Sequence, residues 1–473
     1  MPIFTHEQIF ELLQRLNPWW QNGRLADALP KVKRTAYRQV MEVLGDEEIR
    51  RFAVLSGARR IGKTTILLQA VETLLHEGVA PGNIFYVSFD NPILKLCGFQ
   101  QVLETYRRFI PHAGRYYFFL DEVQYADEWS LWVKTLYDTE PNLRLVATGS
   151  ASPSIERGAS DSGVGRWRVF RVPTMTFREF CAVSGAEPEL PSLPRIEELA
   201  QMEESAFSML MLQMAPLEPL WNRYLLQGGF PELVNVTDTA KAQQILREDV
   251  VDKVLKRDVP SLFDVRNTMD LEKVFLYLCL QSGAIINQAT MSSAIGVSKP
   301  TLSRYIDYLR DANLLYISPS VAYTGKKGLS AQSKMYIADA ALRNACLMNV
   351  SPFSRSEDMG MMAETAVYKH FVNAYGSTAK VGYLRTGAKQ KEVDIAVDFF
   401  PQGDRILCEV KYKNSAELGS EDALLTLCRE HKAAAAFVAT KSSTDFGITR
   451  HPDGVGIPLV RLPAAALCYL LNA

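Results

Sequence analysis

One stretch of the sequence has the residue types and spacing of a nucleoside triphosphate site. From Gly57 to Thr64 the chain reads GARRIGKT, which fits the pattern G-x-x-x-x-G-K-[ST] at every position. Glycines let the backbone curl around an anion, and successive N–H groups and a helix N-terminus then point at the β- and γ-phosphates. The lysine adds a positive charge, and the threonine offers a hydroxyl to Mg²⁺. The residues expected to bind nucleotide here are Gly57, Ala58, Arg59, Arg60, Ile61, Gly62, Lys63, Thr64 and Thr65.

Two acids at the end of a second apolar run fit the other half of such a site. Residues 115–120 read RYYFFL, and Asp121 and Glu122 follow them. A carboxylate at the end of a buried strand can hold the Mg²⁺ of the nucleotide, and a second one beside it can deprotonate the attacking water. We therefore expect Asp121 and Thr64 to bind the metal, and Lys63 and Glu122 to be catalytic, with Glu122 as the base. Without the phosphate loop, the same run would indicate only a strand that ends in solvent.

Two further groups could complete this site. The apolar run from residue 143 ends in Thr148-Gly149-Ser150, where Thr148 or Ser150 could sense the γ-phosphate. A loop cap is the equal alternative. One arginine of the following loop could reach the nucleotide of a neighbouring subunit as an arginine finger. We assign this role to Arg166, which follows Gly163-Val164-Gly165; the alternative is that the arginines of this loop only flank an exposed strand.

The elements that must position these groups follow from the alternation of apolar runs and helical patterns. Strand-like runs at 52–55, 83–89 and 115–120 alternate with amphipathic segments, which predicts a parallel sheet with helices on both faces. The phosphate loop and the acidic pair then meet at the carboxyl edge of that sheet. No Asn-Lys-x-Asp motif, which would read guanine, is present. We therefore expect ATP as the nucleotide.

Composition restricts the remaining possibilities. The length of 473 residues suffices for about three domains of ~150 residues. The formal net charge is −1, so any nucleic acid would have to bind to local patches. Seven cysteines without a C-x-x-C pair argue against a zinc site and a disulfide framework and for a reducing compartment. Because neither a signal peptide pattern nor an apolar segment of ~18 residues is present, we expect a cytoplasmic protein without a membrane partner.

Residues 270–340 have the pattern of a winged helix-turn-helix. A helix that begins after Ser298 carries one apolar face, formed by Leu302, Tyr305, Ile306 and Leu309. Two hydrophobic segments around a basic GKKG tip follow. The residues that such a fold would present to DNA are Lys299, Thr301, Arg304 and Tyr308, with Lys326 and Lys327 in the wing. The alternative is a winged helix that serves only for packing.

Acidic residues near the C-terminus are expected to converge. In residues 392–399 (EVDIAVDF), alternation puts Val393, Ile395, Val397 and Phe399 on one face, and Asp394 on the other. Residues 406–412 group Glu409 with Lys411, and Glu364 lies on the apolar stripe of a helix, where a lone carboxylate is costly. A Mg²⁺-dependent phosphodiesterase uses such a set: Asp394 and Glu409 would bind the metal, Lys411 would position water, and Glu364 would complete the site. The alternative is an ordinary surface with complementary charges.

With these motifs in this order, the chain resembles the predicted AAA+ superfamily ATPases of bacteria and archaea that end in a restriction-endonuclease-like domain of unknown function. The matching stretches are 57–65 (GARRIGKTT), 121–124 (DEVQ), 148–150 (TGS), 228–232 (GGFPE), 392–394 (EVD) and 409–411 (EVK). The resemblance implies an α/β fold: an AAA+ type parallel sheet and a small α/β/α domain of PD-(D/E)xK type, on either side of the winged helix. It also implies binding and hydrolysis of ATP.

We expect four parts: a phosphate-loop ATPase domain with N-terminal helices (1–180), a helical lid or linker (181–265), a winged helix domain (266–350) and a restriction-endonuclease-like domain (351–473). The leading hypothesis is a homo-oligomeric, Mg²⁺- and ATP-dependent switch that acts on DNA through the winged helix and the nuclease-like domain. The alternative is an ATP-dependent binding or scaffold protein whose C-terminal domain is an inert interaction module.

Overall fold

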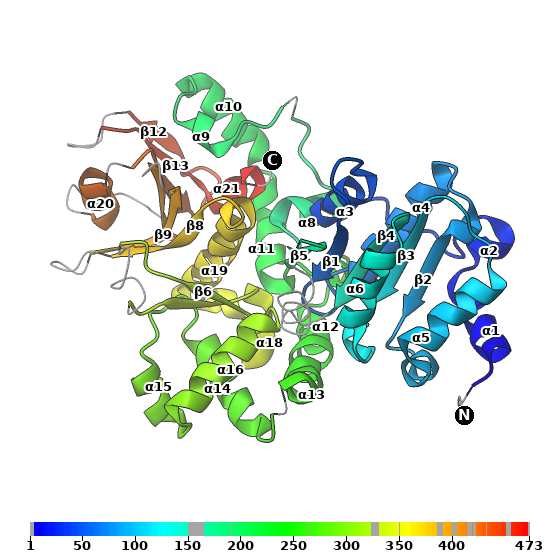
Figure 1. Ribbon diagram of the computed structural model, residues 1–473. Helices are drawn as coiled ribbons and strands as arrows, with labels where there is room; N and C mark the ends of the chain where they lie inside the picture. Colours follow the sequence, from blue (N-terminus) through cyan, green and yellow to red (C-terminus); the bar gives the residue numbers. More distant parts are fainter. Residues whose placement is uncertain are drawn as a thin grey trace. The chain divides into compact units, whose positions relative to one another are not determined.

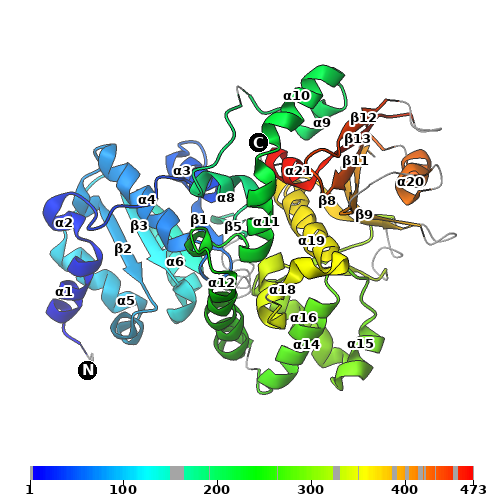
Figure 2. The same ribbon diagram turned by 180° about the vertical axis from the view of Figure 1, so that it is seen from behind.

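The computed structural model describes residues 4–149, 165–190, 192–263, 265–322, 331–349, 351–385, 391–399, 404–413, 419, 422–431, 433–450 and 456–471. The chain divides into two compact units. In Figures 1 and 2 the first 173 residues, which form most of unit 1, are coloured blue to cyan-green, and unit 2 is coloured green to red. Unit 1 comprises Met1–Pro173 and Asp311–Asn313, and unit 2 comprises Thr174–Arg310 and Leu314–Ala473.

Unit 1 is built on a five-stranded parallel sheet, as the alternation of apolar and helical segments predicts. Its spatial order is β2-β3-β4-β1-β5, and its strand pairs are parallel. The strands are β1 (Phe52–Ser56), β2 (Ile84–Ser88), β3 (Tyr116–Asp121), β4 (Leu143–Gly149) and β5 (Trp167–Arg171). Because β1 and β3 both neighbour β4, the loops that follow them lie close together at the carboxyl edge of the sheet.

Helices cover both faces of this sheet. The helices are α1 (His6–Leu16), α2 (Trp19–Asn22), α3 (Thr35–Gly45), α4 (Lys63–His76), α5 (Pro92–Phe109) and α6 (Trp129–Thr139). On one face, α1, α5 and α6 share an apolar core with alternate residues of the strands, such as Phe52 and Val54 of β1. On the other face, α3 packs against α4, and both contact the sheet. The strands are buried along their whole length except at β5 and the last residue of β2.

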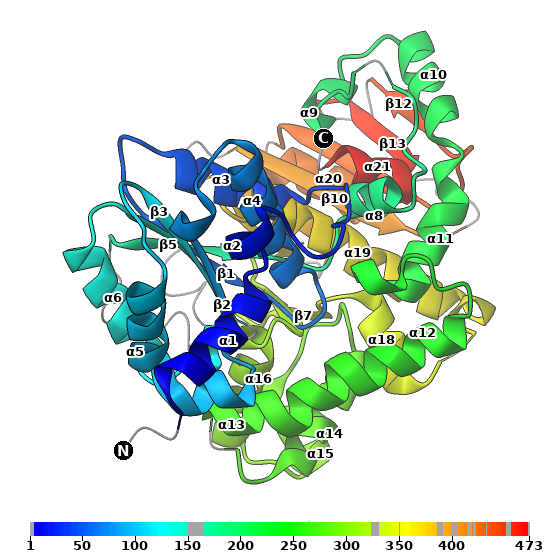
Figure 3. The ribbon, with the colours of Figure 1, turned by 90° about the vertical axis from the view of Figure 1, so that its right-hand side faces the viewer.

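Unit 2 begins with a helical segment. Its helices are α8 (Phe177–Val183), α9 (Ile196–Leu199), α10 (Glu204–Met214), α11 (Leu217–Gln227), α12 (Thr239–Leu246) and α13 (Val259–Phe263). Between α12 and α13, two stretches have π-helical hydrogen bonding, Arg247–Asp252 and Val254–Asp258. Figure 3 shows α10 beside β12 (Gly447–Thr449) of the C-terminal sheet, which it contacts.

Three helices and a two-stranded ribbon follow, in the order that the winged helix pattern predicts. They are α14 (Thr268–Leu280), α15 (Gln288–Ile295), α16 (Lys299–Asp311), β6 (Leu315–Ser318) and β7 (Lys334–Ile337). The ribbon is antiparallel. The apolar face expected for α16 is buried, and the hydroxyl of Ser298 accepts a 3.4 Å hydrogen bond from the Thr301 N–H at its start. The basic tip with Lys326 and Lys327 lies outside the described residues.

The rest of unit 2 is a mixed six-stranded sheet in the order β12-β13-β11-β10-β9-β8. The other strands are β8 (Lys380–Arg385), β9 (Glu392–Phe399), β10 (Asp404–Lys411), β11 (Ala435–Thr440) and β13 (Leu459–Pro463). The remaining helices are α18 (Ala340–Leu347), α19 (Ser356–Tyr375), α20 (Ala423–His431) and α21 (Ala464–Leu470). Helices α19 and α21 share a core with one face of the sheet, and α20 packs on the other.

The strict alternation expected along β9 is wrong at its start. Val393 packs in the core under α20, whereas Ile395, Val397 and Phe399 pack in the core on the α19 side. The cause is a β-bulge: Leu384 of β8 pairs with Val393, but Gly382 pairs with Ala396, so β9 has one extra residue there. A bulge re-aims the side chains around it, and here it lies at Asp394.

Two findings concern the whole described chain. No helix within the described ranges is long and apolar enough to cross a membrane. None of the seven cysteines, all of which lie within the described ranges, forms a disulfide.

Candidate functional site

The phosphate loop joins β1 to α4 with a tight backbone that glycine permits. Gly62, directly before α4, has φ +90°, and Arg60 also has a positive φ of +61°. A Cβ built on Gly57 would lie 2.4 Å from the Ile61 Cδ1 atom and 2.4 Å from the Val172 carbonyl oxygen. Only glycine fits at position 57, because real Cβ atoms do not approach so closely.

Lys63 holds this loop from the inside. Its side chain is buried, and its ammonium donates hydrogen bonds of 2.9 Å to the carbonyl oxygens of Gly57 and of Ala58. Both partners are neutral. A phosphate oxygen in the loop would be a stronger, charge-assisted acceptor for the same ammonium. A bound anion could therefore replace the two backbone carbonyl oxygens as the hydrogen-bond acceptor of the Lys63 ammonium.

Asp121 ends β3 and meets the start of α4. Its Oδ2 atom accepts hydrogen bonds from the Thr64 hydroxyl at 2.7 Å and the Tyr86 hydroxyl at 3.1 Å, and its Oδ1 atom accepts one from the Thr148 hydroxyl. The strand register explains the contact with Thr148, since Leu120 pairs with Ala147 of β4 and Asp121 therefore lies beside Thr148. Two Mg²⁺ ligands at 2.0–2.1 Å in neighbouring octahedral positions are about 2.9 Å apart. The oxygens of Thr64 and Asp121 fit such an ion.

Glu122 is turned out of the strand direction. It has φ +52° and ψ +47°, a left-handed conformation that costs a non-glycine residue about 1–2 kcal/mol. Its N–H donates a 3.1 Å hydrogen bond to the Thr148 hydroxyl, and its carboxylate accepts one from the side-chain amide of Gln124. Residues held in such conformations cluster at functional sites. The Gln124 amide thus fixes the Glu122 carboxylate, and the Glu122 N–H shares the Thr148 hydroxyl with Asp121.

The structure brings Arg59, but not Arg166, to the loop edge. The Arg59 guanidinium donates a 2.6 Å hydrogen bond to the Tyr125 hydroxyl, just after β3. Arg166 lies at the opposite edge of the sheet, since its carbonyl accepts the N–H of Phe52 at the start of β1. Its guanidinium pairs with Asp138 at 2.9 Å. The four residue-to-residue steps from Phe52 to Ser56 span roughly 13 Å, so the Arg166 backbone is remote from the phosphate loop of the same chain. Ser150 lies outside the described residues.

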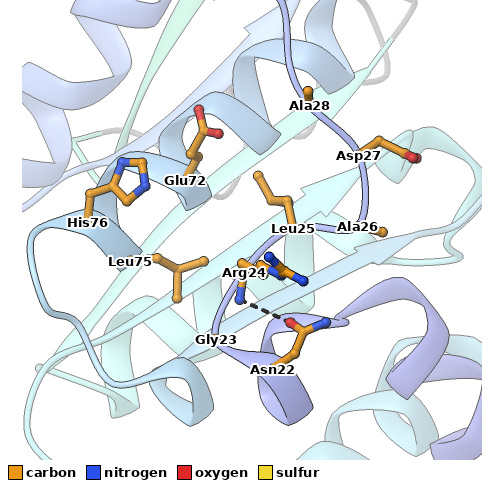
Figure 4. Close-up of a pocket in the computed structure, with 10 residues that line it drawn as sticks. All are labelled: Asn22, Gly23, Arg24, Leu25, Ala26, Asp27, Ala28, Glu72, Leu75 and His76. Atoms are coloured by element: carbon orange, nitrogen blue, oxygen red, sulfur yellow. Dashed lines mark hydrogen bonds between the residues drawn. The ribbon is translucent and has the colours of Figure 1, made fainter.

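A separate hollow lies at the far end of α4. It has a volume of about 450 Å³ and is lined by Asn22, Gly23, Arg24, Leu25, Ala26, Asp27, Ala28, Glu72, Leu75 and His76 (Figure 4). Helix α4 runs for 14 residues, roughly 20 Å. Because His76 ends the helix that Lys63 begins, this hollow is not the phosphate site.

In unit 2, the expected acidic residues meet around a lysine that sequence analysis does not identify. Lys334, the first residue of β7, has its ammonium 2.8 Å from a Glu392 oxygen, 3.2 Å from Asp394 and 3.3 Å from Glu364. The Tyr336 hydroxyl donates a 2.7 Å hydrogen bond to Glu364, and the Val410 N–H donates one of 3.0 Å to Asp394. The Lys334 side chain is only 4% exposed.

Glu409 and Lys411 adjoin this group on β10. Their charged atoms are 3.3 Å apart, and Lys411 also lies 3.6 Å from Asp422. Burial, followed by the Asp394 carboxylate, raises the pKa of Glu409 to about 8. The same two causes raise the pKa of Glu364 to about 7. Burial would lower the pKa of Lys334, but Glu364, Asp394 and Glu392 hold it above the ordinary value for lysine.

In this arrangement the carboxylates do not fit a divalent cation. An ammonium lies among three of them at hydrogen-bonding distance, where a metal ion would need bonds of roughly 2.0–2.6 Å. Among the described residues, no group of three or more His, Cys, Asp or Glu has an arrangement that could hold a metal ion.

A second buried ion pair ties the GGFPE turn to α18 and α19. Lys369 and Asp339 are 2.8 Å apart and almost fully buried. Asp339 also accepts hydrogen bonds from the Thr174 hydroxyl at 2.7 Å and the Gly229 N–H at 3.1 Å. A Cβ on Gly228 would lie 2.5 Å from Asp339 Oδ1. This network explains why two glycines stand in the turn and assigns them a structural role.

Only some of the α16 residues that were expected to face DNA are exposed. Lys299 and Arg304 are exposed, and Thr301 is half-buried. The Tyr308 ring, however, stacks on Phe263 with a centroid distance of 4.0 Å. Tyr308 is therefore engaged within the protein, contrary to the expectation that it would face a DNA groove.

The stretch that carries the phosphate loop matches a known family. Residues 50–181 match a family model described as an AAA domain. The chain contains an AAA domain. Residues 218–352 and 359–462 match two models described as Domain of unknown function, DUF8612 and DUF4143. An AAA domain implies binding of ATP with Mg²⁺ in general and suggests ATPase activity. Its matched residues include the phosphate loop, Asp121 and Glu122.

Relatives that match part of the chain are described as uncharacterized proteins. An uncharacterized protein of Haemophilus influenzae is 25% identical over 299 residues, which are 61% of this chain and 68% of the relative. Two uncharacterized proteins of Methanocaldococcus jannaschii are each 23% identical, over 67% and 56% of this chain. The chain spans 65% and 55% of the length of these two.

Solved structures align at low similarity. The Aeropyrum pernix ORC2 protein, in ADPNP-ADP complexes, aligns over 71% of this chain and 98% of its own, with 12% identity and a TM-score of 0.36. The Thermotoga maritima RuvB Holliday junction branch migration motor aligns over 61% and 90%, with 14% identity and a TM-score of 0.28. AMPPCP-bound DnaA from Aquifex aeolicus aligns over 62% and 92%, with 15% identity and a TM-score of 0.26. The AAA domain rests on the family match and not on these scores.

Sequence reasoning missed Lys334 for a physical reason. A lysine before an apolar run usually ends a strand in solvent, and nothing local in SKMYIA (333–338) indicates a carboxylate partner. The partners are at least 30 residues away, on α19 and β9. The one available signal was Glu364, since a carboxylate on an apolar helix stripe requires a cation.

Proposed function

We propose that this protein is an ATP-hydrolysing switch in which the AAA domain binds ATP and Mg²⁺. The observation that carries the proposal is the 2.7 Å hydrogen bond between Thr64 and Asp121, beside a phosphate loop whose lysine points inward. The residue types and the spacing of these two oxygens suit one hydrated magnesium ion. We retain the four-part division at residues 180, 265 and 350 as part of this proposal.

Different residues of the AAA domain would bind the phosphates, bind the metal ion and activate the water. The backbone N–H groups from Gly57 to Thr65 would hold the phosphates, and the Lys63 ammonium would turn from the carbonyl oxygens of the loop to a phosphate oxygen. Thr64 and Asp121 would hold Mg²⁺, which neutralises charge on the phosphates when bound. Glu122 would orient and deprotonate the attacking water, with its carboxylate held by Gln124.

Substitution of Lys63 tests this proposal. Lys63→Ala should abolish binding of a fluorescent ATP analogue and hydrolysis, while Lys31→Ala, an exposed lysine of the same unit, should leave both at the wild-type level. Circular dichroism at the same temperature must show that the variant is folded. A folded Lys63→Ala protein that hydrolyses ATP at the wild-type rate contradicts the proposal.

We further propose that the switch is a homo-oligomer in which Arg166 serves the nucleotide of a neighbouring copy. Its place at the strand edge opposite the phosphate loop supports a role in trans. Arg166→Ala should then lose ATPase activity, and a mixture of Arg166→Ala and Lys63→Ala chains should regain part of it. An Arg166→Ala protein with wild-type turnover argues against the finger, as does a mixture without recovery.

For the partner we propose DNA, bound by the exposed residues Lys299 and Arg304 of α16. Positive side chains at the start of a helix suit phosphate or base edges. Lys299→Glu combined with Arg304→Glu should weaken binding of a labelled duplex by at least tenfold, as measured by fluorescence anisotropy. Lys241→Glu, an exposed charge change on α12, is the matched control. If the α16 double variant and Lys241→Glu bind the duplex with equal affinity, α16 does not bind DNA.

For the C-terminal domain we propose the non-catalytic alternative, an interaction module. The buried position of Lys334 among Glu364, Glu392 and Asp394 supports it. Plasmid nicking with Mg²⁺ or Mn²⁺ tests this choice against phosphodiesterase activity. Wild-type protein should not nick, and cleavage that is lost in both Asp394→Ala and Glu409→Ala would restore the nuclease hypothesis.

A further inference from the structure

The carboxylate cluster of unit 2 is completed by a strand outside the sheet that carries most of it. Asp394 lies on β9, Glu364 on α19 and Lys334 on β7, which belongs to the β6–β7 ribbon. The ribbon is fastened beside β8: Ser320 bridges to Tyr383, and the Tyr383 hydroxyl donates a 2.7 Å hydrogen bond to the Gln332 carbonyl oxygen. The ribbon thus holds the lysine against the cluster.

The charges in the cluster are unequal. Four carboxyl groups, those of Glu364, Glu392, Asp394 and Glu409, lie around two ammonium groups, those of Lys334 and Lys411. Burial and the Asp394 charge raise the pKa values of Glu364 and Glu409, so in this surplus of acids the charged forms of these two are disfavoured. Buried like charges repel strongly unless a cation lies between them. Lys334 is the cation that contacts three of the four.

An independent observation shows that the cluster has unused capacity for a ligand. The Oε2 atom of Glu409 is buried and has no hydrogen-bond partner in the described part of the chain. Its Oε1 atom is 3.3 Å from the Lys411 ammonium. A buried carboxylate oxygen without a partner costs free energy, so this oxygen is available to a cation that enters the cluster.

We propose that the Lys334 ammonium occupies the place of a divalent cation in this cluster, so that the cluster binds a divalent cation only when the lysine side chain is removed. The site is therefore closed by a residue of the chain itself. In the arrangement described, the lysine supplies the positive charge that a metal ion would supply.

Removal of the lysine tests the proposal with the full chain. Lys334→Ala in EDTA should lower the melting temperature of unit 2 by about 5–10 °C, since it leaves buried carboxylates without their counter-ion. MnCl₂ should restore part of this loss in Lys334→Ala and should not shift the wild type. Lys334→Arg, which keeps a cation, should also show no response to Mn²⁺. The matched control is Lys380→Ala, a lysine of β8 that donates to the Ser320 carbonyl oxygen and should behave as the wild type.

Each other outcome overturns the proposal. The first is a wild-type melting temperature that rises with Mn²⁺ as much as that of Lys334→Ala. The second is a Lys334→Ala protein that is as stable as the wild type in EDTA. The third is a fall in the melting temperature of Lys334→Ala that Mn²⁺ does not reverse. If Lys334→Ala does not fold, the double variant with Asp394→Asn removes one cation and one anion. It should fold in EDTA, and its failure to do so also overturns the proposal. Because the readout is thermal unfolding, the result does not depend on ATP turnover or DNA cleavage.

Discussion

The hydroxyl of Thr64 and the carboxylate of Asp121, 57 positions apart in the sequence, are joined by a 2.7 Å hydrogen bond. The contact spans the carboxyl edge of the sheet, from the start of α4 to the end of β3. It places a hydroxyl and a carboxylate where one Mg²⁺ can bind both, with the carboxylate fixed by Tyr86 and Thr148.

Asp121→Asn tests the metal role separately from the phosphate role. The amide keeps the shape of the side chain but removes the negative charge that favours Mg²⁺. We expect ATPase activity to fall by at least about 100-fold, while ATP binding in EDTA stays within a few-fold of the wild type. Asp127→Asn, an exposed aspartate in the same region, should keep full activity. Unchanged magnesium dependence in Asp121→Asn would contradict the assignment.

Glu122→Gln tests the base. The amide can orient water but cannot accept its proton, so turnover should fall by about 10²–10⁴-fold without loss of ATP affinity. The matched control is Glu128→Gln, since Glu128 is exposed and also has a positive φ, +54°. Single-turnover hydrolysis and equilibrium binding separate the two effects. Weaker ATP binding at normal turnover would mean that Glu122 serves the ligand and not the water.

The nucleotide half of the molecule was predictable because its signals are local. The phosphate loop fixes its own backbone through Gly57 and Gly62, and the buried runs before it and before Asp121 define neighbouring strands of one sheet. The registers of β3 and β1 against β4 then place Asp121 beside Thr148, at the end of the sheet where the loop after β1 begins. Arg166 was harder, because a sequence does not show which edge of a sheet a loop approaches.

The C-terminal half was predictable only in part, because its decisive contacts are long-range. Glu364, Asp394 and Glu409 do lie near one another. The bulge at Asp394, however, breaks the alternation that predicted Val393 on the same face of the strand as Ile395. Neither the bulge nor Lys334 has a sequence pattern of its own. Both depend on how β8 and the β6–β7 ribbon meet, which periodicity along one strand does not reveal.

Gly229→Ala should destabilise unit 2. A Cβ there would lie 2.4 Å from the carbonyl oxygen and 2.5 Å from the nitrogen of Met175, both of them backbone atoms that cannot turn away. We expect a loss of about 2 kcal/mol or more in the free energy of unfolding, as measured by urea denaturation. Gly360→Ala is the control, because no atom lies within 4 Å of a Cβ built at this position. Since Gly360 lies in helix α19, this substitution should raise the free energy of unfolding by about 0.5–1 kcal/mol. Equal free energies of unfolding for the two variants would show that the GGFPE turn accommodates a Cβ at Gly229 without a large cost.

His370 should make unit 2 sensitive to acid. The ring is buried between two backbone groups, since its Nδ1–H donates to the Ala366 carbonyl oxygen at 2.7 Å and its Nε2 accepts the Phe177 N–H at 2.8 Å. This arrangement requires the neutral ring, because a proton on Nε2 would face the Phe177 N–H. Burial, together with the nearby Lys369 charge, lowers the pKa of His370 to about 3.

The sign of the pH dependence follows from the lowered pKa. In the unfolded chain His370 takes up a proton near pH 6.5, whereas in the folded chain it does not, so the unfolded state gains stability as the pH falls below 6.5. We expect the wild type to lose about 2 kcal/mol from this source between pH 7 and pH 5. His370→Gln, which keeps a side-chain acceptor but does not titrate, should start less stable at pH 7.5 and lose less between pH 7 and pH 5. His76→Gln, at the exposed end of α4, should keep the wild-type slope. Parallel curves for wild type and His370→Gln in urea denaturation across this range would mean that the buried ring accepts a proton without cost.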